Sequence, residues 1–192
     1  MLKKFTDYDQ VDVNALNNAT LPKGAYNMQI KGVQLMSGDK GQYLRVDMDI
    51  CDGEYKNFFA RKFENQSGER KNWGCSFFVS IPAEDGSKSD NFKKLLFKTF
   101  ILNVEDSNQG FHWNWNESEL EGKYVGGLFV LKEFRGSDGE IHTIVNIAGT
   151  CTLKRVADGT YKLPKDKLLP KERDNGFKDV DLMQEDIVLP FD

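Results

Sequence analysis

Apolar and polar residues alternate with the two-residue period of a β-strand near the start of the chain. The alternation runs over residues 25–30 and resumes, one residue out of phase, over residues 33–35. The phase changes at Lys31-Gly32, and one extra residue beside a glycine indicates a β-bulge. The pattern therefore predicts a single long strand that bends here, so that its two halves pair with different neighbours.

A second and a third strand are expected to follow in antiparallel order. A turn at residues 37–41 leads into a strand over residues 43–50. The dipeptide Asp52-Gly53 is typical of a hairpin turn and predicts a third strand over residues 54–63. After a polar loop, the apolar segment 75–81 either extends this third strand or forms a short one of its own. The outward face of the second strand would carry Tyr43, Arg45, Asp47 and Asp49.

One helix and two more strands complete the pattern. Ser89 or Asp90 would cap a helix over residues 92–102. Strands are predicted over residues 123–134 and 140–156, joined by a glycine-containing turn. The predicted order of elements is therefore β-β-β-α-β-β. The apolar stripe of the helix would consist of Phe92, Leu95, Leu96 and Thr99.

This order of elements, with a bulged first strand, is the layout of the OB-fold, a small five-stranded Greek-key barrel. We therefore expect a mainly β protein whose OB-fold-like barrel spans residues 22–156. An N-terminal arm (1–21) would precede the barrel, and a basic connector (157–171) and an acidic tail (172–192) would follow it. A mixed β-sandwich is the alternative architecture.

The composition fits one globular domain with extensions and excludes a uniformly basic nucleic-acid binder. The 192 residues include 26 Lys and Arg against 30 Asp and Glu, and 39% of them are hydrophobic. No apolar run approaches the roughly 18 residues of a membrane helix, and no signal-peptide core follows the start. We expect a cytoplasmic protein without membrane contact. The wide spacing of Cys51, Cys75 and Cys151 favours buried free thiols.

Charge is unevenly distributed towards the C-terminus. Residues 172–192 carry seven acids and two bases, a net charge of −5, whereas residues 154–171 carry six bases and two acids, a net charge of +4. The acidic tail contains a proline and no apolar period, so it is expected to be disordered in isolation. Its apolar residues either pack on the body or dock in a partner's pocket. The candidate partner-binding residues are Asp186, Ile187, Leu189, Pro190 and Phe191.

Interleaved cationic and aromatic residues indicate a surface for single-stranded nucleic acid. Such surfaces combine cations along the phosphates with rings on which bases stack, at about 1–3 kcal/mol per base. Residues 55–63 interleave both types, and from a strand only one of Phe58 and Phe59 can face outward. Trp113 and Trp115, beside an acidic stretch, are either stacking residues or part of a lid. The DNA-binding candidates are Lys40, Tyr43, Arg45, Tyr55, Lys56, Phe58, Arg61, Lys62, Trp73 and Arg135.

The sequence contains few candidate catalytic residues. Asp47, Asp49 and Glu54 could hold a divalent metal for a nuclease, although acids also alternate routinely on solvated strand faces. The sequence has neither the phosphate-loop motif GxxxxGK[ST] nor the hydrolase motif GxSxG. We therefore expect no enzymatic activity and no cofactor.

Short motifs between residues 21 and 165 point to a known family. They include Leu-Pro-Lys-Gly-Ala-Tyr at 21–26, Gly-Gln-Tyr-Leu at 41–44 and Ile-Cys-Asp-Gly-Glu-Tyr-Lys-Asn at 50–57, with shorter runs at 91–93, 120–123 and 161–164. These motifs resemble those of phage-encoded single-stranded-DNA-binding-like proteins of recombination and replication modules. The resemblance implies an OB-like barrel that coats single strands, with an acidic tail that recruits enzymes. Tails of this kind usually end on the Phe carboxylate, whereas here Asp192 follows Phe191.

Two functions are expected from these features. The first is a phage single-stranded DNA-binding protein in a bacterial host cell, whose tail recruits a recombinase, polymerase or helicase and occupies the DNA groove when no strand is present. The alternative is a protein-binding adaptor or inhibitor of a replication or recombination enzyme, without DNA affinity of its own. Both functions are compatible with an oligomer.

Overall fold

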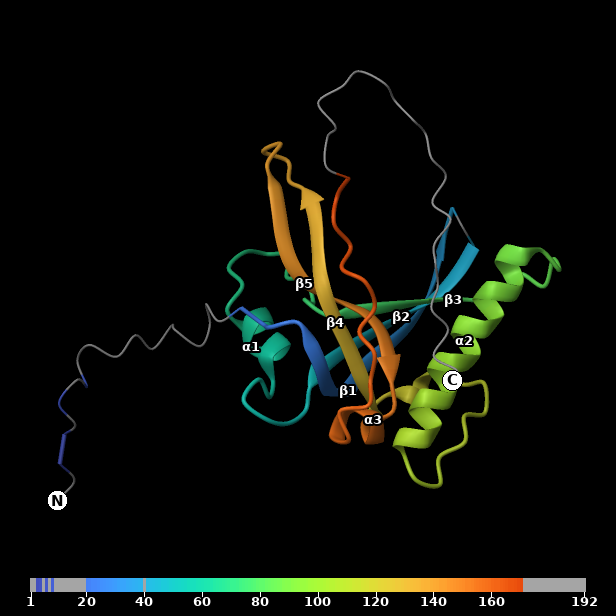
Figure 1. Cartoon of the computed structure of the whole chain (residues 1–192), viewed down its shortest axis with the longest axis horizontal. Helices are drawn as coiled ribbons and strands as arrows, with labels where there is room; N and C mark the ends of the chain where they lie inside the picture. The colour runs from blue at the N-terminus through green and yellow to red at the C-terminus, as the bar shows by residue number, and fades with distance from the viewer. Residues whose placement is uncertain (1–2, 5, 7, 9–19, 40, 171–192) are drawn as a thin grey trace.

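Five antiparallel strands form one sheet in the computed structural model, which describes residues 3–4, 6, 8, 20–39 and 41–170. The mainly β architecture is therefore confirmed. The sheet is not closed, because no ladder joins its two edge strands within these residues. The strands are β1 (Gly24–Gly38), β2 (Gly41–Ile50), β3 (Ser76–Ser80), β4 (Tyr124–Arg135) and β5 (Ile141–Cys151). Within the sheet they lie in the order β3-β2-β1-β4-β5 (Figure 1).

The bulge predicted in the first strand is confirmed. The register between β1 and β2 shifts between Ile30 and Gly32. Residues 24–29 of β1 pair with β4, and residues 28–38 pair with β2. The bend at the bulge therefore lets one strand serve two neighbours, and it places β1 at the centre of the curved sheet.

The predicted third strand at residues 54–63 is wrong, because this segment contains the helix α1 (Phe58–Glu64). The third strand is β3, so the short strand considered for residues 75–81 is the correct alternative. Asp49 explains the difference. Its buried carboxylate accepts hydrogen bonds from the backbone N–H groups of Phe59 and Ala60 at 2.9 and 3.0 Å and so caps the first turn of α1. The prediction that Asp49 faces solvent is accordingly wrong.

The predicted helix is present as α2 (Lys88–Ser107), and it is longer than expected. Its N-cap is Ser87, whose side chain accepts a hydrogen bond from the backbone N–H of Asp90. The predicted apolar stripe is wrong, because Leu96 is 50% exposed. The helix instead packs on the sheet through Phe97, Phe100, Ile101 and Val104. None of the helices within the described residues is long and apolar enough to cross a membrane.

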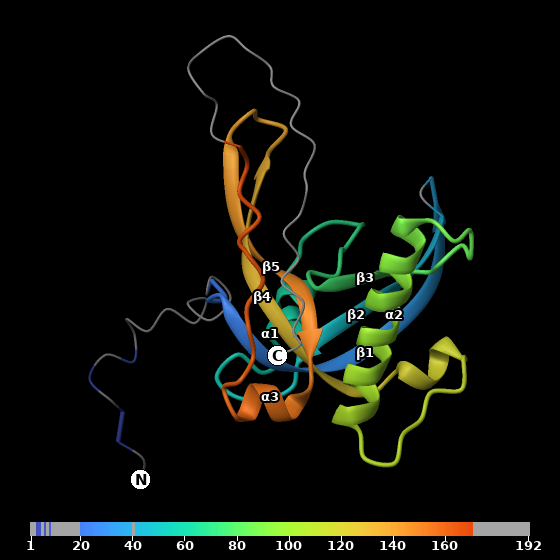
Figure 2. The same cartoon turned by 45° about the vertical axis from the view of Figure 1, so that its right-hand side comes forward.

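The C-terminal part of the described chain differs from the single long strand predicted for residues 140–156. β5 ends at Cys151, and Thr152 then caps the short helix α3 (Leu153–Ala157). Residues 161–170, which we call the strap, follow β4 towards the tip of the β4–β5 hairpin (Figures 1 and 2). Lys167 forms a parallel bridge with Lys132, so the strap adds a short pairing to the free edge of β4.

The core lies between the curved sheet, α1 and α2. β4 is buried on both faces over residues 125–130, and a short 3-10 helix (Glu117–Leu120) leads into it. The three cysteines are free thiols, as predicted; Cys75 and Cys151 are buried and Cys51 is half-buried. Burial raises the pKa of the Cys151 thiol to about 11, so this thiol is protonated at neutral pH.

Candidate nucleic-acid interface

A pair of aromatic rings lies on the outer face of the sheet where β2 pairs with β3. In this ladder Arg45 lies opposite Phe78 and Tyr43 lies opposite Ser80, and directly paired residues share a face of the sheet. The Phe78 side chain is 58% exposed, and its ring meets that of Tyr43 edge-on with centroids 5.8 Å apart. We call Tyr43, Arg45 and Phe78 the ring face.

The charge on the ring face is nearly balanced. The Nε atom of Arg45 lies 3.0 Å from the Oδ1 atom of Asp47, in a partly exposed ion pair. The same Nε atom lies 3.3 Å from the Oγ atom of Ser76, whose hydroxyl donates to Asp47. These contacts fix the direction of the Arg45 side chain on the strand, so the ring face offers stacking surfaces more than net positive charge.

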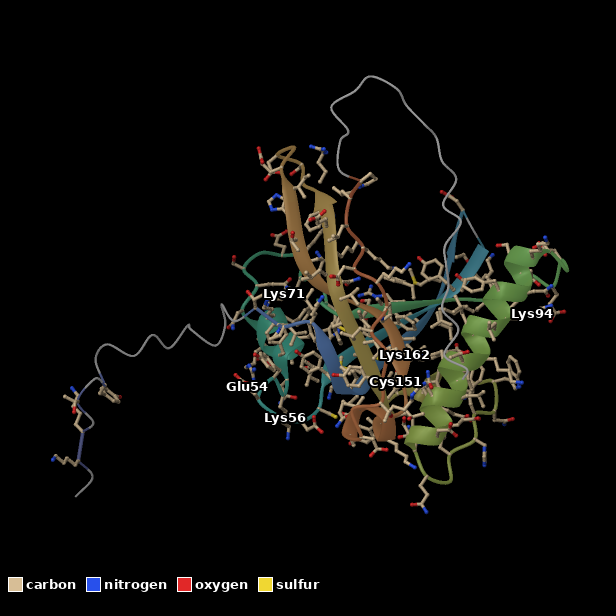
Figure 3. All side chains as sticks on the ribbon, viewed as in Figure 1. Glu54, Lys56, Lys71, Lys94, Cys151 and Lys162 are labelled. Atoms are coloured by element: carbon tan, nitrogen blue, oxygen red, sulfur yellow. The ribbon has the colours of Figure 1, made fainter. Side chains whose placement is uncertain are left out.

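Cations are concentrated beside α1, at the start of β3. We call this group the basic corner, and Figure 3 shows two of its lysines, Lys56 and Lys71, on the α1 side of the molecule. The Nζ atom of Lys62 lies 4.6 Å from the centre of the Phe58 ring, which holds the ammonium group close to the body. The members of the basic corner are Lys56, Arg61, Lys62, Arg70 and Lys71.

Trp73 joins the loop of the basic corner to β2. Its ring is half-buried and lies 5.6 Å from that of Phe63. Its indole N–H donates a 2.9 Å hydrogen bond to the carbonyl of Met48 on β2. This bond fixes the loop that carries Arg70 and Lys71 against the sheet, three residues before β3 begins at Ser76.

The structure corrects several of the residues predicted for DNA binding. Phe58 and Phe59 are both buried, at 3% and 5% exposure, because a helix rather than a strand carries them. The prediction that one of the two faces outward is therefore wrong. Tyr55 is half-buried in edge contacts with Tyr26 and Phe58. None of these three rings presents an open face comparable to that of Phe78.

Arg135, another predicted cation, is not brought to the ring face. Arg135 lies at the end of β4, where its Nη1 atom donates to the carbonyl of Gly139 within the β4–β5 hairpin. Lys40 lies outside the described residues, as do the candidate tail residues 186–191.

Phe78 is the residue that the sequence analysis missed. The signal for it was the segment Ser76-Phe77-Phe78-Val79-Ser80, in which Phe77 and Val79 alternate with Phe78. Phe77 packs on Phe100 of α2 and Val79 is buried, so Phe78 must point to the opposite face. The sequence analysis predicted the third strand at residues 54–63, and it therefore assigned the Phe78 ring to neither face of the sheet.

Two of the three carboxylates considered for a metal, Asp47 and Asp49, make other contacts. Both oxygens of Asp49 accept backbone N–H groups, and Asp47 is paired with Arg45. Across the part of the chain that the structure describes, no group of three or more His, Cys, Asp or Glu side chains is arranged to hold a metal ion.

The fold and the site define a mainly β protein with a surface that combines exposed rings and cations. The chain belongs to the family described as "Protein of unknown function (DUF669)", whose sequence profile matches residues 6–118. The matched region includes β1, β2, β3, α1 and α2, and therefore the ring face and the basic corner. No curated protein matches the chain.

Proposed function

We propose that this protein binds single-stranded DNA across the ring face and the basic corner. The observation that carries the proposal is the position of Phe78, an exposed ring beside Tyr43 and Arg45 on one sheet face. Bases stack on such rings, while cations beside the face attract the phosphates. The ring face would hold the bases, and the backbone of the strand would continue towards Lys62 and Lys71.

The proposal includes an OB-fold-like barrel as the scaffold. Its support is the order β3-β2-β1-β4-β5, in which the bulged β1 pairs with both β2 and β4. The barrel would be open between β3 and β5. In OB-folds the second and third strands and the two hairpin loops bind oligonucleotides, and the ring face occupies β2 and β3 here.

The biological role that we propose is coating of single strands in phage recombination or replication, without catalysis and without a cofactor. Support comes from the motifs at residues 21–57, which resemble those of phage single-strand binders. The apolar residues of the acidic tail, Ile187, Leu189 and Phe191, would recruit a recombinase, polymerase or helicase. The location that follows is the cytoplasm of a bacterial host.

A fluorescence-anisotropy titration tests the DNA-binding proposal. A labelled single strand of mixed sequence should bind more tightly than its duplex, and the affinity should fall as salt rises. Phe78→Ala should weaken single-strand binding by about 1–3 kcal/mol. Ile144→Ala, which truncates an exposed apolar residue of β5, is the matched control and should bind like the unaltered protein. Equal affinity for duplex, indifference to salt, or an unaltered affinity in Phe78→Ala would each contradict the proposal.

A protein-binding adaptor is the second candidate function, and Trp115 favours it. The Trp115 side chain is 78% exposed, and its ring stacks on that of Phe97. The two ring centroids are 6.2 Å apart and the ring planes form an angle of 12°. Tryptophan is enriched among the residues that dominate protein interfaces. The test is a pull-down of partner proteins. If the protein has no DNA affinity, and if Trp115→Ala or deletion of residues 180–192 abolishes capture of a partner, the adaptor function is supported in place of the DNA-binding function.

A further inference from the structure

The apolar stripe that the sequence predicts for α2 faces away from the sheet. α2 lies at the margin of the molecule (Figure 1) and buries its opposite face against the sheet. Leu95, Leu96 and Leu102 are 38%, 50% and 45% exposed. Apolar residues that follow one exposed face of a helix, rather than lying singly, mark an interaction surface. We call this surface the outer stripe, and its members are Phe92, Leu95, Leu96, Thr99 and Leu102.

The outer stripe is long, narrow and without charge. Its one polar member is Thr99, whose hydroxyl donates a 2.8 Å hydrogen bond to the carbonyl of Leu95 within the helix. Thr99 therefore adds no unsatisfied donor to the surface. From Phe92 to Leu102 the helix rises by about 15 Å. A second helix laid along α2 has the matching shape.

The charges of α2 indicate which helix fits. Residues 88–98 contain four lysines and one aspartate, a net charge of +3, whereas residues 99–107 contain Glu105 and Asp106, a net charge of −2. In an antiparallel pair of α2 helices, the basic half of each copy lies along the acidic end of the other, so the charges are complementary. A parallel pair would bring like charges together.

The antiparallel orientation also matches the residues of the outer stripe with one another. Lys88 and Asp106 are both exposed, and they lie 18 residues apart, which is about five helical turns. Both therefore lie on the same side of α2, one at each end. With a two-fold axis beside residue 97, residues at equal distances before and after it lie opposite each other in the two copies. The pairs are then Lys88 with Asp106, Phe92 with Leu102, and Leu95 with Thr99.

We propose that the outer stripe is the interface of a homodimer, in which two copies of α2 pack antiparallel about a two-fold axis. An interface of this symmetry uses the same surface of both copies, which is what the charges of α2 allow. Phe77 of β3 packs on Phe100 of α2, whereas Phe78 points to the opposite face of the sheet. The dimer therefore leaves the ring face uncovered, and the inference does not depend on DNA binding.

Sedimentation velocity of the full chain at several concentrations tests the dimer. One pair of helices is smaller than a standard interface, so we expect a Kd in the micromolar range. Leu95→Glu keeps a good helix former but places a charge in the outer stripe, and it should raise the Kd more than about tenfold. Ile144→Glu, which adds the same charge at an exposed apolar position of β5, is the matched control and should dimerise like the unaltered protein.

A charge exchange tests the antiparallel register. Lys88→Glu and Asp106→Lys should each raise the Kd by about three- to tenfold, because each places like charges opposite one another at two symmetry-related positions. The double variant should restore the Kd of the unaltered protein. Glu suits the N-terminus of a helix and Lys its C-terminus, so both replacements favour α2 itself. Circular dichroism melts of all the variants confirm that they fold.

Three results would overturn the proposal. A chain that stays monomeric at every concentration leaves the outer stripe to another occupant, such as the acidic tail or a different protein. A dimer that survives Leu95→Glu forms through another surface. A double variant that dimerises no better than Lys88→Glu alone shows that these two residues do not face each other, and the antiparallel pairing is then wrong.

Discussion

Asp49 shows how one side chain sets the local structure around the candidate site. Its carboxylate is fully buried, and its oxygens accept from the backbone N–H groups of Ile50, Phe59 and Ala60. A buried carboxylate is tolerated only where such donors replace water, and the N-terminus of a helix adds a favourable partial positive charge. Asp49 thus connects the end of β2 to α1 and keeps the basic corner beside the ring face.

Replacement of this carboxylate should destabilise the whole domain. In Asp49→Asn one of the two oxygens becomes an NH₂ group, which faces a backbone donor and leaves it unsatisfied. We expect the free energy of unfolding to fall by about 1–3 kcal/mol, measured by urea denaturation. The matched control is Asp47→Asn, which alters a partly exposed ion pair and should cost less than about 1 kcal/mol. Equal losses in the two variants would contradict the capping role of Asp49.

The strand β4 is covered on both faces over residues 125–130. Two glycines, Gly126 and Gly127, lie where other elements approach it closely. A Cβ atom at residue 126 would be 2.7 Å from both the Sγ atom of Cys151 and the Cγ2 atom of Val156. The close packing of β5 and α3 against β4 therefore requires a residue without a side chain at this position.

Gly126→Ala should accordingly strain the contact between β4, β5 and α3. Overpacking of this kind costs about 1–3 kcal/mol, and we expect a corresponding loss in the free energy of unfolding. Gly32→Ala is the control, because a Cβ atom at residue 32 meets nothing within 4 Å. Urea denaturation of both variants checks the difference. A Gly126→Ala protein as stable as Gly32→Ala would show that α3 shifts without cost.

Alternation of apolar and polar residues was sufficient to predict β1 and β2, which bury one face in a periodic way. The glycine-containing turn between two apolar segments was sufficient to predict β4 and most of β5. The sequence pattern failed for α1, which is short and whose capping carboxylate lies outside the helix, ten residues before Phe59. The strap was missed for a similar reason. Its pairing with β4 at Lys132 depends on a contact between distant segments and leaves no period in the sequence.

The candidate site was predicted in part, and the errors follow from the error in α1. Tyr43 and Arg45 were placed correctly on the outward face of β2, since a strand alternates strictly. Phe58 was assigned to the same surface only because its segment was expected to be a strand. The exposed ring belongs instead to Phe78, and which of the adjacent residues Phe77 and Phe78 faces outward is decided by the packing of α2.

At the scale of the whole molecule, a chain with a net charge of −4 can bind DNA only if its cations are grouped. The basic corner holds five of them, and residues 54–71 carry a net charge of +2 because Glu54, Glu64 and Glu69 lie in the same segment. The ammonium groups of Lys62 and Lys71 lie over the rings of Phe58 and Phe63, so their positions are restricted before a strand binds. Because these side chains are already restricted, they lose less conformational entropy when a strand binds.

The salt dependence of binding should therefore report on the basic corner. For single strands, each phosphate contact contributes about 0.7 to the slope of log affinity against log salt. Lys62→Ala combined with Lys71→Ala should reduce that slope by about 1–1.5 and weaken all sequences alike, because phosphates carry no base information. Anisotropy titrations with a mixed-sequence single strand at several salt concentrations measure both effects.

The control for this experiment is Lys98→Ala, which removes an exposed lysine of α2 and should leave the slope unaltered. The double variant also loses two contacts between lysines and rings, so its thermal melt must be compared with that of the unaltered protein. A folded double variant with an unaltered slope would show that the phosphates do not pass the basic corner. The phosphates would then have to contact other cations, such as the exposed lysines of the strap, Lys162, Lys165 and Lys167.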